Sequence, residues 1–172
     1  MKRDPEALAA LYDELFPGLY RVVWFTTRDE GATHEIISAV IPRTLAAIPA
    51  FDTRAPTARA WLFSTAWEIL HREHKHAIPA LGYHLPPHFL DESAQNTVEV
   101  GAESDALAAA LHQLPSLWQN IVVLRYFGGL ESREVAYVLS RKEESVERIE
   151  TEALAEIGYW LQGFARDRNS PS

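Results

Sequence analysis

LPSLWQNIVVLRYFGGLESREVAYVL, residues 114–139, is the stretch that indicates the fold. Its apolar residues recur at spacings of three and four as far as Gly128-Gly129, which predicts a helix that ends at the two glycines. A short helix is expected from Glu131 to Leu139, and a longer one from Glu144 to Leu161. Two helices joined by about four residues form the helix-turn-helix arrangement, which commonly docks on DNA.

Helical periodicity also marks the N-terminal half. We expect helices from Pro5 to Phe25, from Ala32 to Ile48 and from Thr57 to His74, with Pro17-Gly18 kinking or interrupting the first. A segment without periodicity follows, which contains three prolines and no Lys or Arg between residues 77 and 101. The predicted fold is therefore all-α, with a three-helix domain in residues 1–78, a flexible linker in 79–103, a helix-turn-helix domain in 104–165 and a polar tail in 166–172.

The charge is acidic and unevenly divided. The formal net charge is −8, with nine Lys and Arg against ten Asp and Glu in residues 1–78, none against four in 79–103, and seven against ten in 104–172. Proteins that bind nucleic acid usually carry a basic surface, because each phosphate contact uses a cation to displace counterions. No such surface is visible in these counts.

The composition argues against several classes of protein. The chain has no cysteine, which excludes disulfides and thiolate chemistry and fits a reducing compartment. We see no export signal and no apolar run of roughly 20 residues, so a cytoplasmic protein without membrane insertion is expected. There is no glycine-rich phosphate loop, nucleophile elbow or metal-hydrolase pair. We therefore expect no enzyme, no cofactor and no metal.

Two clusters of residue types could serve either structure or binding. The histidines near the third helix lack firm ligand spacing, which favours a solvated helix end over a metal site; they are His71, His74, His76, His84 and His88. Four aromatic residues, which could serve as base-stacking platforms, lie on periodic helix faces that favour a place in the core. Trp61, Trp67 and Trp118 are expected in the core, and Phe63 is the one candidate for exposure.

Two blocks of sequence carry a family resemblance. The first holds Leu11-Tyr12, Phe16 to Tyr20, Ile48 to Asp52 and Ala58 to Phe63. The second holds Leu114-Pro115, Val123 to Leu130 and Glu134 to Leu139. In order and spacing these blocks resemble regions 2 and 4 of the extracytoplasmic-function sigma factors of the sigma-70 family. Together they cover most of residues 8 to 161.

The resemblance implies a function in transcription initiation and a set of site residues. In the family, the second helix of region 2 binds core RNA polymerase, which implies contacts from Glu35, Ser38, Ala39 and Arg43. The third helix and the loop before it capture the non-template promoter strand, which implies Asp52, Thr53, Arg54, Arg59, Phe63 and Arg72. The recognition helix enters the major groove and would offer Arg141, Lys142, Glu143, Ser145, Glu147 and Arg148.

The departures from the family pattern keep a second hypothesis open. Ser38-Ala39 replaces the usual Gln-Glu pair of the polymerase-binding helix, and Glu131 replaces the usual capping serine, so that Ser132 could cap instead. Residues 131–160 hold eight glutamates and four basic residues, where the family usually has Lys or Arg. This acidity is either an ordinary solvated face or a functional change that weakens DNA binding. The alternative function is a sigma mimic that sequesters an anti-sigma factor or another regulator through its acidic region 4-like domain.

Overall fold

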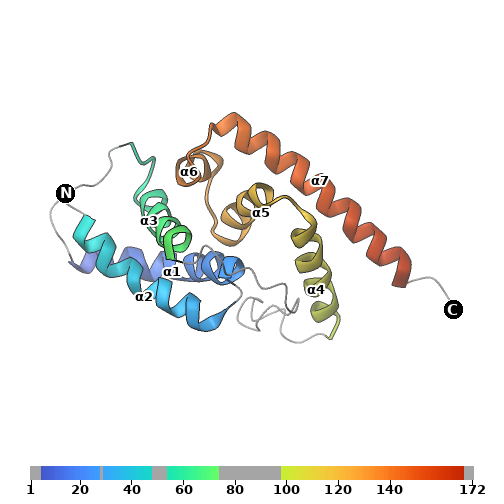
Figure 1. Ribbon diagram of the computed structural model, residues 1–172, viewed down its shortest axis with the longest axis horizontal. Coiled ribbons are helices and arrows are strands. Elements are labelled where there is room, and N and C mark those ends of the chain that lie inside the picture. Colours follow the sequence, from blue (N-terminus) through green and yellow to red (C-terminus); the bar gives the residue numbers. More distant parts are fainter. Residues whose placement is uncertain (1–4, 28, 48–53, 74–97, 169–172) are drawn as a thin grey trace. The chain divides into compact units, whose positions relative to one another are not determined.

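The structure is a computed structural model, and it describes residues 5–27, 29–47, 54–73 and 98–168. Every regular element in these ranges is a helix (Figure 1), so the prediction of an all-α fold is confirmed. Internal contacts divide the chain into two units: Met1–Pro79 with Val123–Val146, and Ala80–Val122 with Glu147–Ser172. The domain boundaries proposed from the sequence, 1–78 and 104–165, stay a prediction.

Unit 1 contains a bundle of three helices: α1 (Pro5–Thr27), α2 (Glu30–Ala47) and α3 (Ala58–Glu73), each in contact with the other two. Of the two effects predicted for Pro17-Gly18, an interruption of the first helix is wrong, because α1 runs through both residues, and a kink stays a prediction. Proline removes one backbone hydrogen bond from a helix interior. Leu15 and Leu19, on either side of the pair, are both buried, and this packing holds the helix together.

Side-chain caps start the second and third helices. The Asp29 carboxylate accepts a hydrogen bond from the Ala32 backbone N–H at 2.6 Å at the start of α2. The Thr57 hydroxyl accepts one from the Ala60 N–H at 3.0 Å at the start of α3. Each oxygen satisfies an N–H that has no partner within its helix. The caps fix the direction in which the chain begins each helix, so the face that each helix turns to the core is set locally.

The rest of unit 1 is the first part of the helix-turn-helix. A π-helical turn, η3 (Val123–Phe127), leads through Gly128 and Gly129 to α6 (Ser132–Val138). Four residues then precede α7 (Glu143–Arg168), as the sequence predicts for this motif. Ser132 is the first helical residue of α6 and not its cap; Glu131 is the N-cap. Its N–H donates to the Glu134 carboxylate at 2.8 Å, which is one half of a capping box.

Unit 2 contains α4 (Val98–Gln113), α5 (Ser116–Val122) and most of α7. Helix α4 begins before Ser104, where the sequence predicts the second domain to start, and α7 extends beyond the predicted end at Leu161. The buried face of α7 includes Val146, Ile149, Ala153 and Ile157, at the three- and four-residue spacing of a helix that packs one side. Among the described residues, no helix is long and apolar enough to cross a membrane.

Gly128 should be the least replaceable glycine of unit 1. A Cβ there would lie 2.6 Å from the Leu124 carbonyl oxygen and 3.0 Å from a methyl of Val22. We expect Gly128→Ala to destabilise the protein by about 1 to 3 kcal/mol through this overlap. Gly158→Ala is the matched control, because that position in α7 has open space around it and alanine favours a helix by about 1 kcal/mol. Urea denaturation should therefore give shifts of opposite sign, and equal shifts would contradict the close approach.

Candidate functional site

A buried carboxylate joins α6 to α3 within unit 1. Glu134 is fully buried, yet four donors reach it. Arg59 donates from Nε to Oε1 at 3.2 Å and from Nη2 to Oε2 at 2.5 Å. The Thr57 hydroxyl donates to Oε1, and the Glu131 backbone N–H donates to Oε2 at 2.8 Å. A buried charge needs such a complete set of partners, and charge-assisted bonds of this kind are the strong ones.

Two opposing effects set the ionisation of Glu134. Burial alone would raise its pKa, since removal from water disfavours the charged form. The hydrogen bonds from Arg59, Thr57 and the Glu131 N–H, with the Arg59 charge, outweigh burial and hold the pKa of Glu134 below its ordinary value. The carboxylate is therefore ionised at neutral pH, and α3 and α6 are joined by an ion pair.

Acid should weaken the ion pair between Glu134 and Arg59 in a defined range of pH. A depressed pKa stabilises the fold fully above the unfolded value of about 4.3, and the contribution is lost as pH falls through the lower, folded pKa. Urea denaturation of the wild type and of Glu134→Gln from about pH 7 to about pH 3 measures this. The difference in unfolding free energy between the two should shrink only below about pH 4.3. A difference that stays constant over the whole range would contradict the assignment.

The residues predicted to contact a single strand separate into four groups. Asp52 and Thr53 lie outside the described residues. Arg54 and Arg72 are exposed, with Arg72 paired to Glu68 one turn away, whereas Arg59 is held by Glu134. Phe63 is 1% exposed, so the prediction that it escapes the core is wrong. It lines a small cavity together with the α1 residues Leu19, Val22 and Val23.

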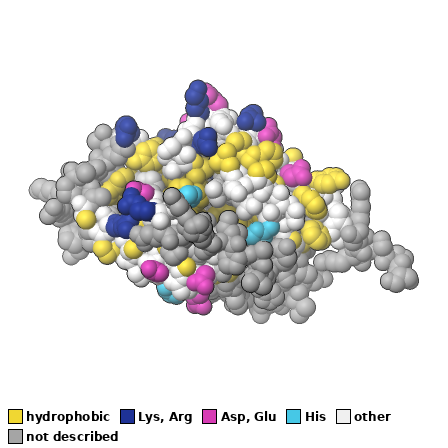
Figure 2. All heavy atoms as spheres, viewed as in Figure 1, with side chains coloured by type: hydrophobic (Ala, Val, Ile, Leu, Met, Phe, Trp, Pro, Cys, Tyr) yellow, Lys and Arg dark blue, Asp and Glu magenta, His cyan; other side chains and the backbone are white. Residues whose placement is uncertain are grey.

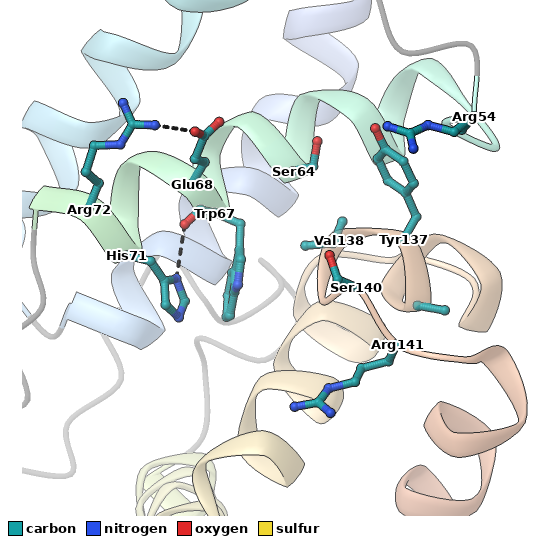
Figure 3. A pocket seen from close by; sticks show the side chains of 11 residues that line it. Arg54, Ser64, Trp67, Glu68, His71, Arg72, Tyr137, Val138, Ser140 and Arg141 are labelled. Carbon is teal, nitrogen blue, oxygen red and sulfur yellow. Dashed lines mark hydrogen bonds and ion pairs between the residues drawn. The ribbon is translucent and has the colours of Figure 1, made fainter.

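An open cleft of about 760 Å³ lies between α3 and the α6–α7 turn of unit 1. Arg54, Arg72 and Arg141 are among its lining residues, and Glu68 is the one acid. In Figure 3, Trp67 and His71 on α3 face the Ser140 and Arg141 side of the turn across this space. The cleft lining is thus basic in a chain of net charge −8. The structure brings together Arg54, Arg72 and Arg141, which the sequence assigned to two separate DNA contacts.

The residues predicted to bind polymerase share the outward side of α2. Glu35 and Ser38 are exposed, and Ala39 and Arg43 are partly exposed. The opposite side of the helix is packed, with Ile36, Ile37 and Val40 buried. The side chains of the predicted contact surface are therefore not needed to hold the bundle, and they leave a face to which a partner has access.

The recognition residues lie at the turn and the first turns of α7. Arg141, Lys142, Glu143, Glu147 and Arg148 are exposed and Ser145 is partly exposed. Arg148 pairs with Glu152 at 2.8 Å, so one of the few cations on this face is matched by an acid. Ser140, in the turn, has a φ of 53°, in the left-handed region that non-glycine residues rarely adopt. This residue lets the chain reverse between the two helices.

Comparison with known proteins shows which sequences this chain resembles. Residues 110–157 match the family described as sigma-70, region 4. Over 167 residues the chain is 23% identical to an extracytoplasmic-function RNA polymerase sigma factor, BldN of Streptomyces coelicolor, covering 95% of this chain and 63% of that protein. The chain is therefore similar to the extracytoplasmic-function sigma factors. It spans less than two thirds of the length of BldN.

The solved structures that resemble this sigma-like chain share its fold. CnrH, solved with the cytosolic domain of CnrY, has a TM-score of 0.66 at 20% identity, covering 98% of this chain and 92% of CnrH. The sigma factor RpoE of Bartonella quintana, solved with the anti-sigma factor NepR, has a TM-score of 0.68 at 11% identity, covering 91% and 98%. These matches confirm the predicted class, an all-α fold of the sigma-factor type with two helical domains.

The partners of Glu134 were not predicted from the sequence of this sigma-like chain. The eight glutamates between residues 131 and 160 were expected to form one acidic face, but Glu134 and Glu150 are buried. Six remain exposed: Glu131, Glu143, Glu144, Glu147, Glu152 and Glu156. One signal was present in the sequence, since Glu134 directly precedes Val135 and lies four residues before Val138, both apolar residues of the helix expected from Glu131 to Leu139.

Proposed function

We propose that this chain is a transcription factor of the sigma type that associates with core RNA polymerase and supports promoter-specific initiation. The observation that carries the proposal is the match of residues 110–157 to sigma-70 region 4, in a chain whose whole fold is that of such factors. The outward face of α2, with Glu35 and Ser38 exposed over a packed core, supports it as the polymerase contact. Sigma factors are not enzymes, so the proposal includes no catalytic step.

The proposal gives Arg59 two alternative partners. It is the predicted contact for a promoter strand, and it is held by Glu134 in this structure. One guanidinium cannot form a bidentate pair with a carboxylate and bind a phosphate with the same donors. Release of α6 from α3 would therefore free these two donors of Arg59 for a promoter strand.

Transcription from purified components tests the proposal. Core polymerase with this chain should give discrete transcripts from a library of genomic fragments, whereas core polymerase without it should give none. Complex formation has its own control, because Arg148→Ala changes a predicted DNA contact whose ion pair is open to solvent and should leave polymerase association intact. Absence of any discrete transcript, with the complex formed, would reject promoter-specific initiation for this chain.

The second candidate is a sigma mimic that sequesters an anti-sigma factor. The observation that favours it is the set of six exposed glutamates on the helix-turn-helix. A carboxylate near a DNA phosphate is repelled by it, so several together oppose groove binding. Affinity capture at moderate salt separates the two candidates. Recovery of polymerase subunits without a small helical inhibitor would reject the mimic, and recovery of the inhibitor alone would reject the initiation factor.

A further inference from the structure

The apolar face of α7 continues beyond the point where the fold covers it. Ala153 and Ile157 are buried, but Trp160 and Phe164, which follow on the same side at helical spacing, are 37% and 43% exposed. Leu154, on the flank of this face, is 41% exposed. Four of the five large apolar side chains exposed in the described residues lie in α7, the fourth being Tyr159. Clustering of this kind marks an interaction surface more often than chance exposure does.

This surface lies mostly outside the sigma-type match. The region 4 match ends at residue 157, so Tyr159, Trp160 and Phe164 all follow it. They also lie at least three turns beyond Arg141 and Lys142, the cations of the predicted DNA contact. The binding of core polymerase or promoter DNA therefore does not account for them, and the surface is an addition to the proposed function.

Carboxylates border the apolar face. Glu152 and Glu156 are exposed beside it, and the Trp160 indole N–H donates to the Glu156 carboxylate at 3.2 Å. From residue 147 to the end of α7 at residue 168 there are four glutamates and one aspartate against three arginines, and one of these arginines, Arg148, is paired with Glu152. Figure 2 shows hydrophobic and acidic side chains next to each other over this part of the molecule. An apolar stripe with an acidic border fits a partner with the opposite border.

The acidic border of this apolar face indicates which kind of partner can bind to it. A second copy would place side by side two helices that each have a net charge of −2 between residues 147 and 168, and like charges across an interface are unfavourable. Anionic lipid surfaces attract basic and not acidic helices. Residues 79–103 of the same chain carry four acids and no Lys or Arg, so they do not complement the border either. A helix with an apolar seam between Lys or Arg residues complements both the stripe and its border.

We propose that the C-terminal part of α7, centred on Leu154, Trp160 and Phe164, is a docking surface for a basic amphipathic helix of a partner protein. The apolar seam of that helix packs on Trp160 and Phe164. Its cations lie over Glu152 and Glu156. Aromatic side chains that are partly exposed in the free protein and buried in the complex supply most of the affinity in such interfaces.

A pair of designed peptides tests the proposal with the full chain. The probe is a helical peptide of about 18 residues with leucines on one face and lysines beside them, and its control carries glutamates in place of the lysines. We expect saturable binding of the lysine peptide, a tenfold or greater loss with Trp160→Ala/Phe164→Ala, and no loss with Tyr126→Ala. Tyr126 is a suitable control because it is exposed elsewhere in the chain.

Further measurements distinguish specific docking from nonspecific hydrophobic association. Circular dichroism should show unchanged helicity in the double variant, because neither side chain is buried. Glu152→Lys/Glu156→Lys should reverse the preference from the lysine to the glutamate peptide. Equal binding of the two peptides by the wild type would overturn the proposal. So would concentration-dependent dimerisation through Trp160, or binding to vesicles of phosphatidylserine that competes with the peptide.

Discussion

Arg59→Ala should destabilise unit 1 by about 3 kcal/mol, because it leaves the carboxylate of Glu134 buried without its charged partner. Glu134 is fully buried, whereas the side chain of Arg59 is 32% exposed. Removal of the arginine should therefore lower the free energy of unfolding more than removal of the acid does, since water can solvate a partly exposed guanidinium. Urea denaturation followed by circular dichroism measures both variants, and Glu134→Gln should be clearly less destabilising than Arg59→Ala.

A matched control separates this effect from a general loss of charge. Arg148 and Glu152 form an exposed pair, with 64% and 42% of their side chains accessible. Arg148→Ala should change the free energy of unfolding by less than about 1 kcal/mol. The double variant Arg59→Ala/Glu134→Gln should recover part of the loss, because it removes the unpaired charge. Equal costs for Arg59→Ala and Arg148→Ala would contradict the buried pair.

Charge reversal on the recognition helix should raise duplex DNA affinity by about a hundredfold at low salt. The substitutions are Glu143→Lys, Glu144→Lys and Glu147→Lys, at exposed positions of the first turns of α7. Each new lysine removes a repulsion and can add a phosphate contact. The slope of log affinity against log salt should steepen by about 0.9 for each phosphate neutralised. Mobility shifts with random duplex over a range of salt measure both quantities.

The position of the lysines can be tested apart from their number. Asp13→Lys, Glu14→Lys and Glu30→Lys produce the same change in net charge at exposed sites on α1 and α2. This control should give a much smaller gain in affinity if the acidic surface of α7 is what weakens DNA binding. Comparable gains in the two triple variants would show that net charge alone is responsible, and would remove the case for a changed DNA face.

Local patterns were sufficient to predict the helices. Periodic apolar residues identified α1, α2 and α3, and the two glycines located the end of η3, because these features act over a few residues. Pro17 misled the prediction for the opposite reason. The packing that carries α1 through the proline comes from other helices, and no short window of sequence contains it.

The site was harder to predict than the fold. Arg59 and Glu134 are 75 residues apart in the chain, and no spacing rule connects them. Phe63 was misassigned because four consecutive residues of α3, Ala60 to Phe63, are all buried. Contacts with α1, α2 and α6 cover α3 on several sides, so periodicity could not show which aromatic residue stays partly exposed. The outward face of α2 was assigned through family resemblance, and its role stays a prediction.

Titration of a fluorescently labelled chain with purified core RNA polymerase tests the central proposal most directly. At about 0.15 M salt we expect saturable binding with a Kd below about 1 μM. Glu35→Arg with Ser38→Arg on the outward face of α2 should weaken it at least tenfold. Asp13→Arg with Glu14→Arg, on the exposed side of α1, should leave it unchanged. Absence of saturable binding at every salt concentration would contradict assignment of this chain as a polymerase-associated sigma factor.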